Sequence, residues 1–286
     1  MTGPTSDQGS TRKAVSRDGT VIVACVRGHG SPVVLLPAGP ADSELAWRHV
    51  VPHLSEHHTC YLLETRGRGL SGDQPDHCPD RLVEDVLALT ESVGEPVGLV
   101  GWGPGNVWAR VAARKDAALV GLAVYDPGAD EVRRSEEASK RRGEMFTRMR
   151  ELVDEGRLVD AAHTFVESSD VFYPAEDLAS GIATKFWEAT AARIPLWLDE
   201  NRQAAESEQP GPTSPSQLRE ITIPVLLMPG ERTSQWYSHS AEHVARHVAD
   251  ATLRPIPGAA HFGPHTHPRA VADEIIRFFA RIHAAT

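Results

Sequence analysis

A glycine-rich turn near the middle of the chain has the setting of a catalytic turn but lacks its reactive residue. The apolar residues 97–100 predict a buried strand, the sequence Gly101-Trp102-Gly103-Pro104-Gly105 follows, and apolar residues at helical spacing come next. In a strand–turn–helix with the pattern G-x-Ser-x-G, the sharp turn exposes a nucleophilic serine above a parallel sheet. Here the outer glycines are kept, but Gly103 takes the place of the serine. Glycine has no side chain with which to attack a substrate.

Alternating strand and helix patterns surround this turn and must position it. Short apolar segments predict strands at residues 32–37, 58–64, 119–125, 221–228 and 252–256, and a hairpin of two strands at residues 14–27. Helical patterns are present at residues 44–54, 80–93 and 235–248, and in a last helix that begins at Pro268. This alternation predicts an α/β fold with a mostly parallel, doubly wound sheet.

The chain divides into three kinds of segment. Residues 1–13 are polar and predict a flexible tail. Residues 129–220 are charged, helical in pattern and without strand signals, which predicts a helical cap inserted into an α/β core of residues 14–128 and 221–286. Aromatic residues such as Trp187 and Trp197 give this cap an apolar face, for which packing inside the cap is the simpler explanation.

The bulk composition limits the classes of partner. Of 286 residues, 41% are hydrophobic and 24% are charged, as in a globular protein with a core. The net charge of −10 argues against nucleic acid and against an anionic membrane as partners. No apolar run approaches the roughly 20 residues that span a bilayer, and the N-terminal residues lack the apolar core of a signal peptide. Cys25, Cys60 and Cys78 have no metal-ligand spacing, so reduced thiols and a cytoplasmic location are expected; formation of a homodimer stays open.

Over residues 16–282 the chain resembles the α/β-hydrolase superfamily. The resemblance is carried by the glycine-rich turn, the loop of residues 37–40, Trp47, residues 66–71, residues 223–231 and residues 256–262. The segments on either side of the cap are most similar to relatives of haloalkane dehalogenases and epoxide hydrolases. The resemblance implies an eight-stranded, mostly parallel sheet with a helical cap, whereas function has to be argued from the site.

The resemblance also assigns roles to two residues. His261 stands where the family has its catalytic histidine, on the loop after the last strand. The usual position of the acid that orients this histidine holds Thr233, but a second acid position known in some relatives holds Asp126. A His261–Asp126 dyad is therefore expected, although an Asp followed by Pro127-Gly128 could equally shape a turn.

The donors that stabilise an oxyanion in the family are affected as well. One donor is the backbone N–H of the residue after the nucleophile, which is Pro104 here, and the other comes from the loop near Gly39 and Pro40. Proline has no N–H. Loss of one donor typically costs about 100- to 1000-fold in turnover, and loss of the nucleophile removes the covalent route. Ester or amide hydrolysis by the family's mechanism is therefore disfavoured.

These residues favour a cofactor-independent enzyme that uses acid/base chemistry. A neutral histidine held by a carboxylate can remove or return a proton near neutral pH. Epimerisation, elimination or dehydration, and cyclisation of a hydrophobic small molecule suit such a site. The chain looks like atypical superfamily members that catalyse such steps, often in natural-product biosynthesis. His261 and Asp126 are then the catalytic residues, and the expected substrate-binding residues are Gly39, Pro40, Trp102, Gly103, Pro104, Trp187, Trp197 and Phe262.

Two alternatives stay open. The first is a small-molecule binding protein without chemistry, similar to members of the fold that lost triad residues, in which His261 would only hydrogen-bond the ligand. The second is hydrolysis by a water molecule that His261 activates. Pro104 argues against this for acyl substrates. The route that relatives use for epoxides needs an aspartate at position 103 and paired cap tyrosines, and Tyr173 is the only tyrosine in the predicted cap.

Three other patterns carry little weight. The sequence His265-Thr266-His267, just before Pro268, is more typical of a helix start than of a metal site. The glycine-rich turn lacks the G-x-G-x-x-G spacing of a dinucleotide site. No metal and no cofactor are therefore expected. A run of basic residues predicts a solvated helix face: Arg133, Arg134, Lys140, Arg141 and Arg142.

Overall fold

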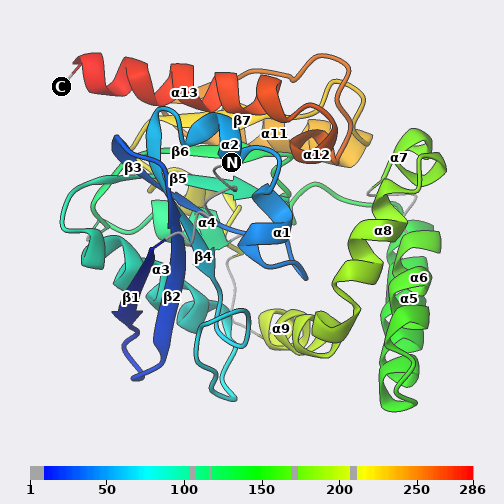
Figure 1. Ribbon diagram of the computed structural model, residues 1–286. Helices are drawn as coiled ribbons and strands as arrows, with labels where there is room; N and C mark the ends of the chain where they lie inside the picture. The colour runs from blue at the N-terminus through cyan, green and yellow to red at the C-terminus, as the bar shows by residue number, and fades with distance from the viewer. Residues whose placement is uncertain (1–9, 104–106, 116, 169–172, 207–210, 286) are drawn as a thin grey trace, which may run out of the picture.

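A computed structural model describes residues 10–103, 107–115, 117–168, 173–206 and 211–285. The described residues form one sheet of eight strands, drawn in Figure 1. The strands are β1 (Thr11–Val15), β2 (Val21–Arg27), β3 (Ser31–Leu35), β4 (His58–Glu64), β5 (Val97–Trp102), β6 (Leu119–Tyr125), β7 (Val225–Met228) and β8 (Ala251–Leu253). Their order is β1-β2-β4-β3-β5-β6-β7-β8, in which the β1–β2 and β2–β4 pairs are antiparallel and the others are parallel.

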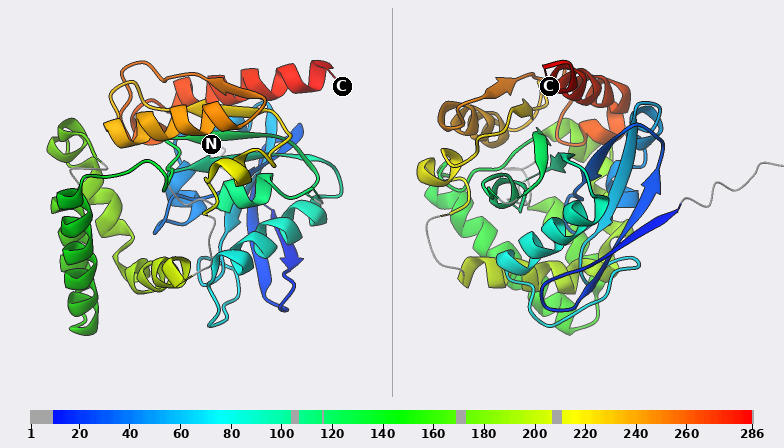
Figure 2. Two further views of the ribbon diagram at one scale, coloured as in Figure 1. Left: turned by 180° about the vertical axis from the view of Figure 1, so that it is seen from behind. Right: turned by 90° about the vertical axis from the view of Figure 1, so that its left-hand side faces the viewer.

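Helices cover both faces of the sheet, because alternate side chains of each buried strand point to opposite sides. In β5, Leu99 belongs to the apolar cluster formed with α3 (Pro79–Val93), α4 (Val107–Ala112) and α11 (Gln235–His247). The next residue, Val100, belongs to the opposite cluster, formed with α2 (Val51–Leu54) and α13 (Pro268–Ala285). Figure 1 shows α13 on one side of the sheet and α3 on the other, and Figure 2 gives two further views of these layers.

A helical insertion follows β6. Between β6 and β7 the described residues form helices and no strand. The elements are α5 (Glu136–Asp154), α6 (Leu158–Glu167), α7 (Ala175–Ala179), α8 (Ile182–Ala189), the 3-10 turn η1 (Ala191–Arg193), α9 (Ile194–Glu206) and α10 (Pro215–Leu218). In Figure 1, α5, α6 and α8 lie together beside the sheet, and α9 turns back from them toward the core. This arrangement agrees with the helical character predicted for the cap.

Among the sequence predictions of element bounds that are wrong, the N-terminal tail and the helix at residues 44–54 each have a clear physical reason. The predicted tail of residues 1–13 overlaps β1, because Thr11–Val15 pairs in register with β2. Backbone hydrogen bonds rather than apolar burial hold this edge strand, where charged residues are common. The predicted helix of residues 44–54 is two helices, α1 (Ser43–Trp47) and α2, because Pro52 lies in the first turn of α2 and a proline cannot continue a helix from its interior. By contrast, β4 and β6 have the bounds that were predicted.

None of the described helices is both long enough and apolar enough to cross a membrane.

Candidate active site

Gly103 directly follows β5 and faces the loop that carries His261. Its φ of 81° belongs to the left-handed region, which glycine adopts at low cost. A Cβ atom placed on Gly103 would lie 4.0 Å from the Cβ of Ala38 and 4.0 Å from Cε1 of His261. A side chain at position 103 would therefore contact the imidazole, and glycine leaves that space open. Pro104, whose missing N–H entered the sequence argument, lies outside the described residues.

His261 and Asp126 form a buried pair beside this position. Asp126 directly follows β6, and His261 lies on the loop after β8. Nδ1 of His261 is 2.9 Å from Oδ2 of Asp126, and the two side chains are 6% and 0% exposed. Because an ionised carboxylate only accepts hydrogen bonds, His261 donates through Nδ1, and Nε2 is left as the basic nitrogen. The two residues are brought together as expected, and their catalytic role stays a prediction.

Three donors hold the carboxylate of Asp126. Besides His261, the hydroxyl of Thr233 donates to Oδ2 at 2.6 Å, and the backbone N–H of Gly230 donates to Oδ1 at 2.9 Å. The φ of Asp126 is 43°, a left-handed conformation that costs a non-glycine residue about 1–2 kcal/mol. A simple turn does not need this set of contacts. Thr233 stands at the position where the family usually has the acid, and its hydroxyl binds Asp126, the acid of this chain.

Two tyrosine rings flank His261, and the sequence analysis assigned neither of them to the site. Tyr237, near the start of α11, stacks on the imidazole with ring centres 4.4 Å apart and planes inclined by 9°. Tyr173 of the cap stacks at 5.3 Å and 28°. Burial raises the pKa of both phenols, so both hydroxyls stay protonated. The one sequence signal for Tyr237 is its place at the start of the helix that follows Thr233.

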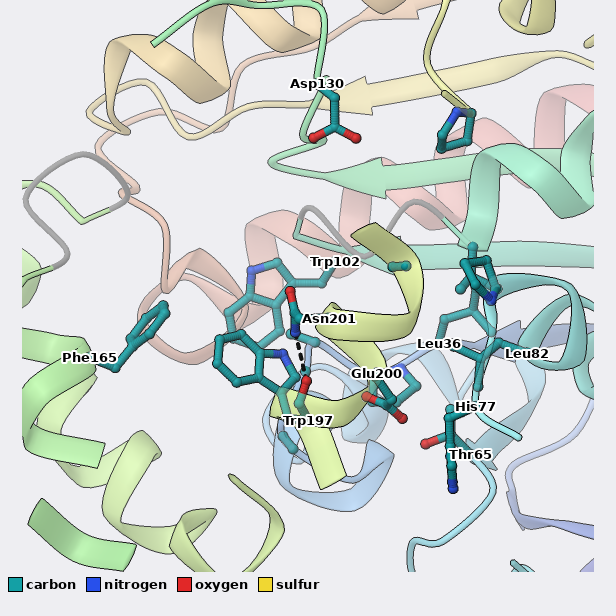
Figure 3. A pocket seen from close by; sticks show the side chains of 18 of the residues that line it. Leu36, Thr65, His77, Leu82, Trp102, Asp130, Phe165, Trp197, Glu200 and Asn201 are labelled. Carbon is teal, nitrogen blue, oxygen red and sulfur yellow. Dashed lines mark hydrogen bonds between the residues drawn. The ribbon is translucent and has the colours of Figure 1, made fainter. Parts of the chain in front are cut away.

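A cavity of about 710 Å³ lies between the core and the helical insertion, with His261 in its wall. Five of the expected substrate-binding residues line it: Gly39, Trp102, Trp187, Trp197 and Phe262. Figure 3 shows Trp102 from the core and Phe165 and Trp197 from the insertion around this space. The wall is therefore mostly aromatic close to the dyad.

Two of the expected binding residues do not line the cavity. Pro40 is buried, and the wall is made instead by its neighbour Gly39, which packs so closely on Trp197 that a Cβ at position 39 would lie 2.8 Å from Cδ1 of that ring. Pro40 therefore does not form part of the wall, and a role for it in binding stays a prediction. Gly103 has no side chain to present to the cavity and borders His261 through its backbone.

The basic run is half-buried rather than solvated at one of its members, Arg134. Four members are exposed, as predicted: Arg133, Lys140, Arg141 and Arg142. Arg134 and Arg142 line the cavity. The guanidinium carbon of Arg134 is 4.0 Å from the centre of the Trp236 ring, and that of Arg142 is 4.8 Å from the centre of the Phe146 ring. Arg141 does not line the cavity and pairs with a glutamate one turn away on α5. Arg134 lies before α5, and helical periodicity does not predict the direction of side chains outside a helix.

The remaining sequence signals lie outside the site. His265 is half-buried, its Nε2 is 3.2 Å from the carbonyl oxygen of Ala46, and burial lowers its pKa to about 4. Pro268 begins α13, which agrees with the interpretation of this segment as a helix start. Among the described residues, no group of three or more His, Cys, Asp or Glu side chains could hold a metal ion. The three cysteines are free thiols.

Comparisons with known proteins agree with this fold. A family model described as "Alpha/beta hydrolase family" matches residues 33–274, so the chain belongs to the alpha/beta hydrolase family, as the sequence resemblance predicted. The chain is 32% identical to N-formylmaleamate deformylase from Pseudomonas putida over 104 residues, which are 35% of this chain and 38% of the deformylase. The match thus spans well under half the length of that relative.

Solved structures of similar fold cover nearly the whole chain. An alpha/beta hydrolase from Sphaerobacter thermophilus is 26% identical with a TM-score of 0.73, over 94% of this chain and 100% of that one. An esterase from Thermogutta terrifontis is 21% identical with a TM-score of 0.75, over 96% and 99%. A haloalkane dehalogenase from Bradyrhizobium elkani is 20% identical with a TM-score of 0.67, over 97% and 99%. The last two likenesses establish the fold alone.

Proposed function

We propose that this protein is a cofactor-independent enzyme in which His261, oriented by Asp126, moves a proton on a hydrophobic small molecule. The observation that carries the proposal is the buried His261–Asp126 hydrogen bond beside a glycine at the position of the family's nucleophile. The base and its orienting acid are kept, whereas position 103 has no atom that could form a covalent intermediate. Proton transfer requires only the base and the acid that orients it.

The proposed step begins with removal of a substrate proton by Nε2 of His261. The imidazolium that forms lies against the carboxylate of Asp126, which Thr233 and the backbone of Gly230 hold in place. Return of the proton to the opposite face of the same carbon completes an epimerisation. Its transfer to a leaving hydroxyl completes a dehydration, in which the electron pair of the broken C–H bond becomes the new double bond. Ring closure follows when that electron pair attacks a carbonyl carbon of the same molecule, whose C=O π-bond electrons move to the oxygen, and the oxygen takes the proton from His261.

The walls of the cavity support an apolar substrate. Trp102, Trp187 and Phe262 border the space beside the base, and large aromatic side chains favour flat, hydrophobic ligands. The neutral hydroxyls of Tyr173 and Tyr237 belong to side chains that line the cavity, where a protonated phenol can donate a hydrogen bond to a polar atom of the substrate. Exclusion of bulk water by these rings strengthens the electrostatic interaction of the imidazolium with Asp126. Membership among the atypical enzymes of natural-product biosynthesis is part of the proposal.

Hydrolysis by a water molecule that His261 activates is a second candidate. The observation that favours it is the 104-residue match to N-formylmaleamate deformylase, together with the hydrolase names of the structural neighbours. The space beside Gly103 could hold such a water. Against it stands the proline at position 104, which removes a backbone donor from the expected oxyanion site.

The test compares the wild type with His261→Ala in a small-molecule extract of the organism that produces the protein, followed by mass spectrometry. The proposal predicts an isomer, or a product that has lost one water, whose formation falls about 100- to 10,000-fold in His261→Ala. The matched control is His265→Gln, four residues further along the chain, which lies outside the cavity lining and keeps a donor for the carbonyl of Ala46. This control is expected to keep the wild-type rate.

Three results would contradict the proposal. Equal product formation by His261→Ala would show that His261 is not the base. A product that has gained one water and depends on His261 would favour the hydrolytic candidate. A compound that co-purifies unchanged with both proteins would identify a binding protein instead.

A further inference from the structure

The part of the insertion around α7 lies against the loops of the core that form the proposed site. The ring of Tyr173, just before α7, stacks on the imidazole of His261 with ring centres 5.3 Å apart. Glu176 of α7 pairs at 2.5 Å with Arg232, which belongs to the loop after β7. Figure 1 shows α7 on the side of the insertion toward α12 (Gly263–Thr266), the short helix that follows the loop of His261.

Asp177 of α7 is a buried acid that contacts the loop of His261. It is 4% exposed, and its Oδ2 accepts a hydrogen bond from the backbone N–H of Phe262 at 3.3 Å. Phe262 directly follows His261 in the chain. A side chain of the insertion is therefore bonded to the main chain of the loop that carries the proposed base.

Two strands of the core hold the same loop by its carbonyl groups. The hydroxyl of Tyr125 on β6 donates to the carbonyl oxygen of Ala260. The indole N–H of Trp102 on β5 donates to the carbonyl oxygen of His261 at 3.2 Å. Asp177 accepts from the next N–H along the loop. Buried backbone groups need such partners, and here the core supplies two donors while the insertion supplies an acceptor.

The placement of an acid at position 177 is costly for stability. Moving a carboxylate out of water is unfavourable unless hydrogen bonds hold it. Burial raises the pKa of Asp177, whereas the hydrogen bond from the N–H of Phe262 acts in the opposite direction. A neutral side chain of similar size would fill the same space without this cost. The acid at this place therefore indicates a role in the site and not in packing alone.

We infer that Asp177 is a positioning residue, which fixes the loop of His261 from the insertion and so holds the imidazole beside Gly103. The inference rests on the proposed function in taking His261 as the base. A catalytic group has to stay within about 0.5 Å of its productive position, and residues that hold its backbone provide this precision. Asp177 is not among the residues that line the cavity, so it acts through the loop and not on a substrate.

The first measurement follows the backbone amide signal of Phe262 by nuclear magnetic resonance in the intact, isotope-labelled wild type. Protonation of a carboxylate weakens the hydrogen bond that it accepts, and the donor signal moves with it. The signal is expected to move as the pH falls through the pKa of Asp177, which lies above the ordinary 3.8. The same titration of Asp177→Asn should lack this movement. A Phe262 signal that stays in place in the wild type, or that moves alike in both proteins, would overturn the inference.

The second measurement reports the position of the imidazole through its Nδ1 proton, which the carboxylate of Asp126 holds. Asp177→Ala removes the acceptor, and it is expected to broaden or abolish this proton signal and to raise the exchange rate of the Phe262 amide at least about tenfold. Amides of β6 should exchange as in the wild type, which separates lost positioning from a lost fold. Asp177→Asn keeps an oxygen at the same place and should keep the Nδ1 signal. An unchanged Nδ1 signal in Asp177→Ala would overturn the inference.

Glu176→Gln is the matched control, because it removes a carboxylate one residue away on α7 that pairs with Arg232 instead. It should keep the Nδ1 signal and the amide exchange of the wild type. If Asp177→Ala does not fold, the first measurement still decides, since it uses the wild type and Asp177→Asn.

Turnover gives a third readout once a compound that depends on His261 is known. Its kcat should fall about 10- to 100-fold in Asp177→Ala with KM nearly unchanged, because a displaced base slows the chemical step more than binding. Asp177→Asn should recover most of this loss, and equal kcat values for Asp177→Ala and the wild type would contradict the positioning role. The two resonance measurements need no substrate, so failure of the proposed function is distinguishable from failure of this inference.

Discussion

At the scale of single residues, the site is defined by what surrounds one glycine. Gly103 keeps the left-handed φ of the turn, and His261 and Asp126 keep the hydrogen bond that orients a base. Under the proposed function, the family's catalytic triad lacks its nucleophile at position 103, and Pro104 cannot provide a backbone N–H donor. If this description is right, restoring the hydroxyl should restore a reactive serine.

Gly103→Ser is expected to create a nucleophile that a fluorophosphonate probe labels and that intact-protein mass spectrometry detects. The new Cβ has only ordinary contacts at 4.0 Å, so the main cost is the positive φ, about 1–2 kcal/mol of stability. Ester turnover should stay about 100- to 1000-fold below that of an ordinary member of the family, because residue 104 is a proline.

Gly103→Ala is the control, since it has the same backbone strain and no hydroxyl. It should remain unlabelled, as should the wild type. Labelling of the wild type as fast as Gly103→Ser would reveal another nucleophile. A folded Gly103→Ser protein without labelling would show that position 103 does not face a functional base.

The sequence was most informative where a residue's role follows from its place at a strand end. Asp126 and His261 both follow strands of the parallel sheet, whose carboxyl ends meet at one edge, so their meeting could be predicted. Arg134 and Tyr237 could not, because each reaches the cavity through the path of a loop or the first turn of a helix. Loop paths depend on tertiary packing that a single sequence does not display.

At the scale of elements, a buried ion pair fixes the segment after β4 to α3. The guanidinium of Arg66 is 0% exposed and makes two hydrogen bonds, of 2.8 and 2.6 Å, to the carboxylate of Asp85 on α3. A third contact of 2.8 Å joins it to Asp18 in the turn between β1 and β2. Arg66 belongs to a sequence pattern that carried the family resemblance, and its role is to hold three elements together.

Asp85→Asn is expected to lower the free energy of unfolding by about 3 kcal/mol, because it removes the fully buried one of the two carboxylates that pair with the guanidinium of Arg66, while Asp18 stays in place. Urea denaturation followed by circular dichroism measures the change. Asp160→Asn removes a carboxylate from an exposed pair with Arg157 and should cost less than about 1 kcal/mol. Similar losses in both variants would mean that Arg66 finds another partner.

The bounds of helices and strands could be predicted where the residues of the segment itself determine them. The bounds of β4 and β6 follow from apolar runs between turn signals, and those strands lie where expected. The break between α1 and α2 depends on one proline in an otherwise helical pattern. The strand at Thr11–Val15 carries little apolar signal, because its partner β2 rather than a core face determines it.

At the scale of the whole molecule, ion pairs connect the core to the helical insertion around a buried acid. Arg68 of the core pairs with Glu200 on α9, and Arg193 of the insertion pairs with Asp42 of the core. Glu64, at the end of β4, lies near these charges and is 3% exposed. Burial, followed by the negative charges of Asp42 and Glu44, raises its pKa to about 7.

Glu64 should therefore make stability depend on pH. Its pKa is higher in the folded protein than the ordinary value of 4.5, so its contribution is fully present below about pH 4.5 and is lost as the pH rises through 7. Glu64→Gln resembles the protonated acid and is expected to be more stable than the wild type by roughly 3 kcal/mol at pH 8 and equal to it at pH 4.

Thermal unfolding across this range measures the effect, with Glu56→Gln at an exposed position as the control. The control should follow the wild-type curve. A difference between Glu64→Gln and the wild type that does not change with pH would show that the carboxyl does not titrate in this window.

The central claim, that His261 transfers protons without hydrolysis, is tested most directly by isotopes of water. A compound whose turnover depends on His261 is incubated in parallel in heavy water and in water labelled with heavy oxygen, and the product is analysed by mass spectrometry. The account predicts no heavy oxygen in the product of any of the three reactions, and deuterium at the reacting carbon when the product is an epimer; neither the epimer nor its deuterium should form with His261→Ala. Heavy oxygen in the product would contradict the account and assign the protein to hydrolysis by an activated water.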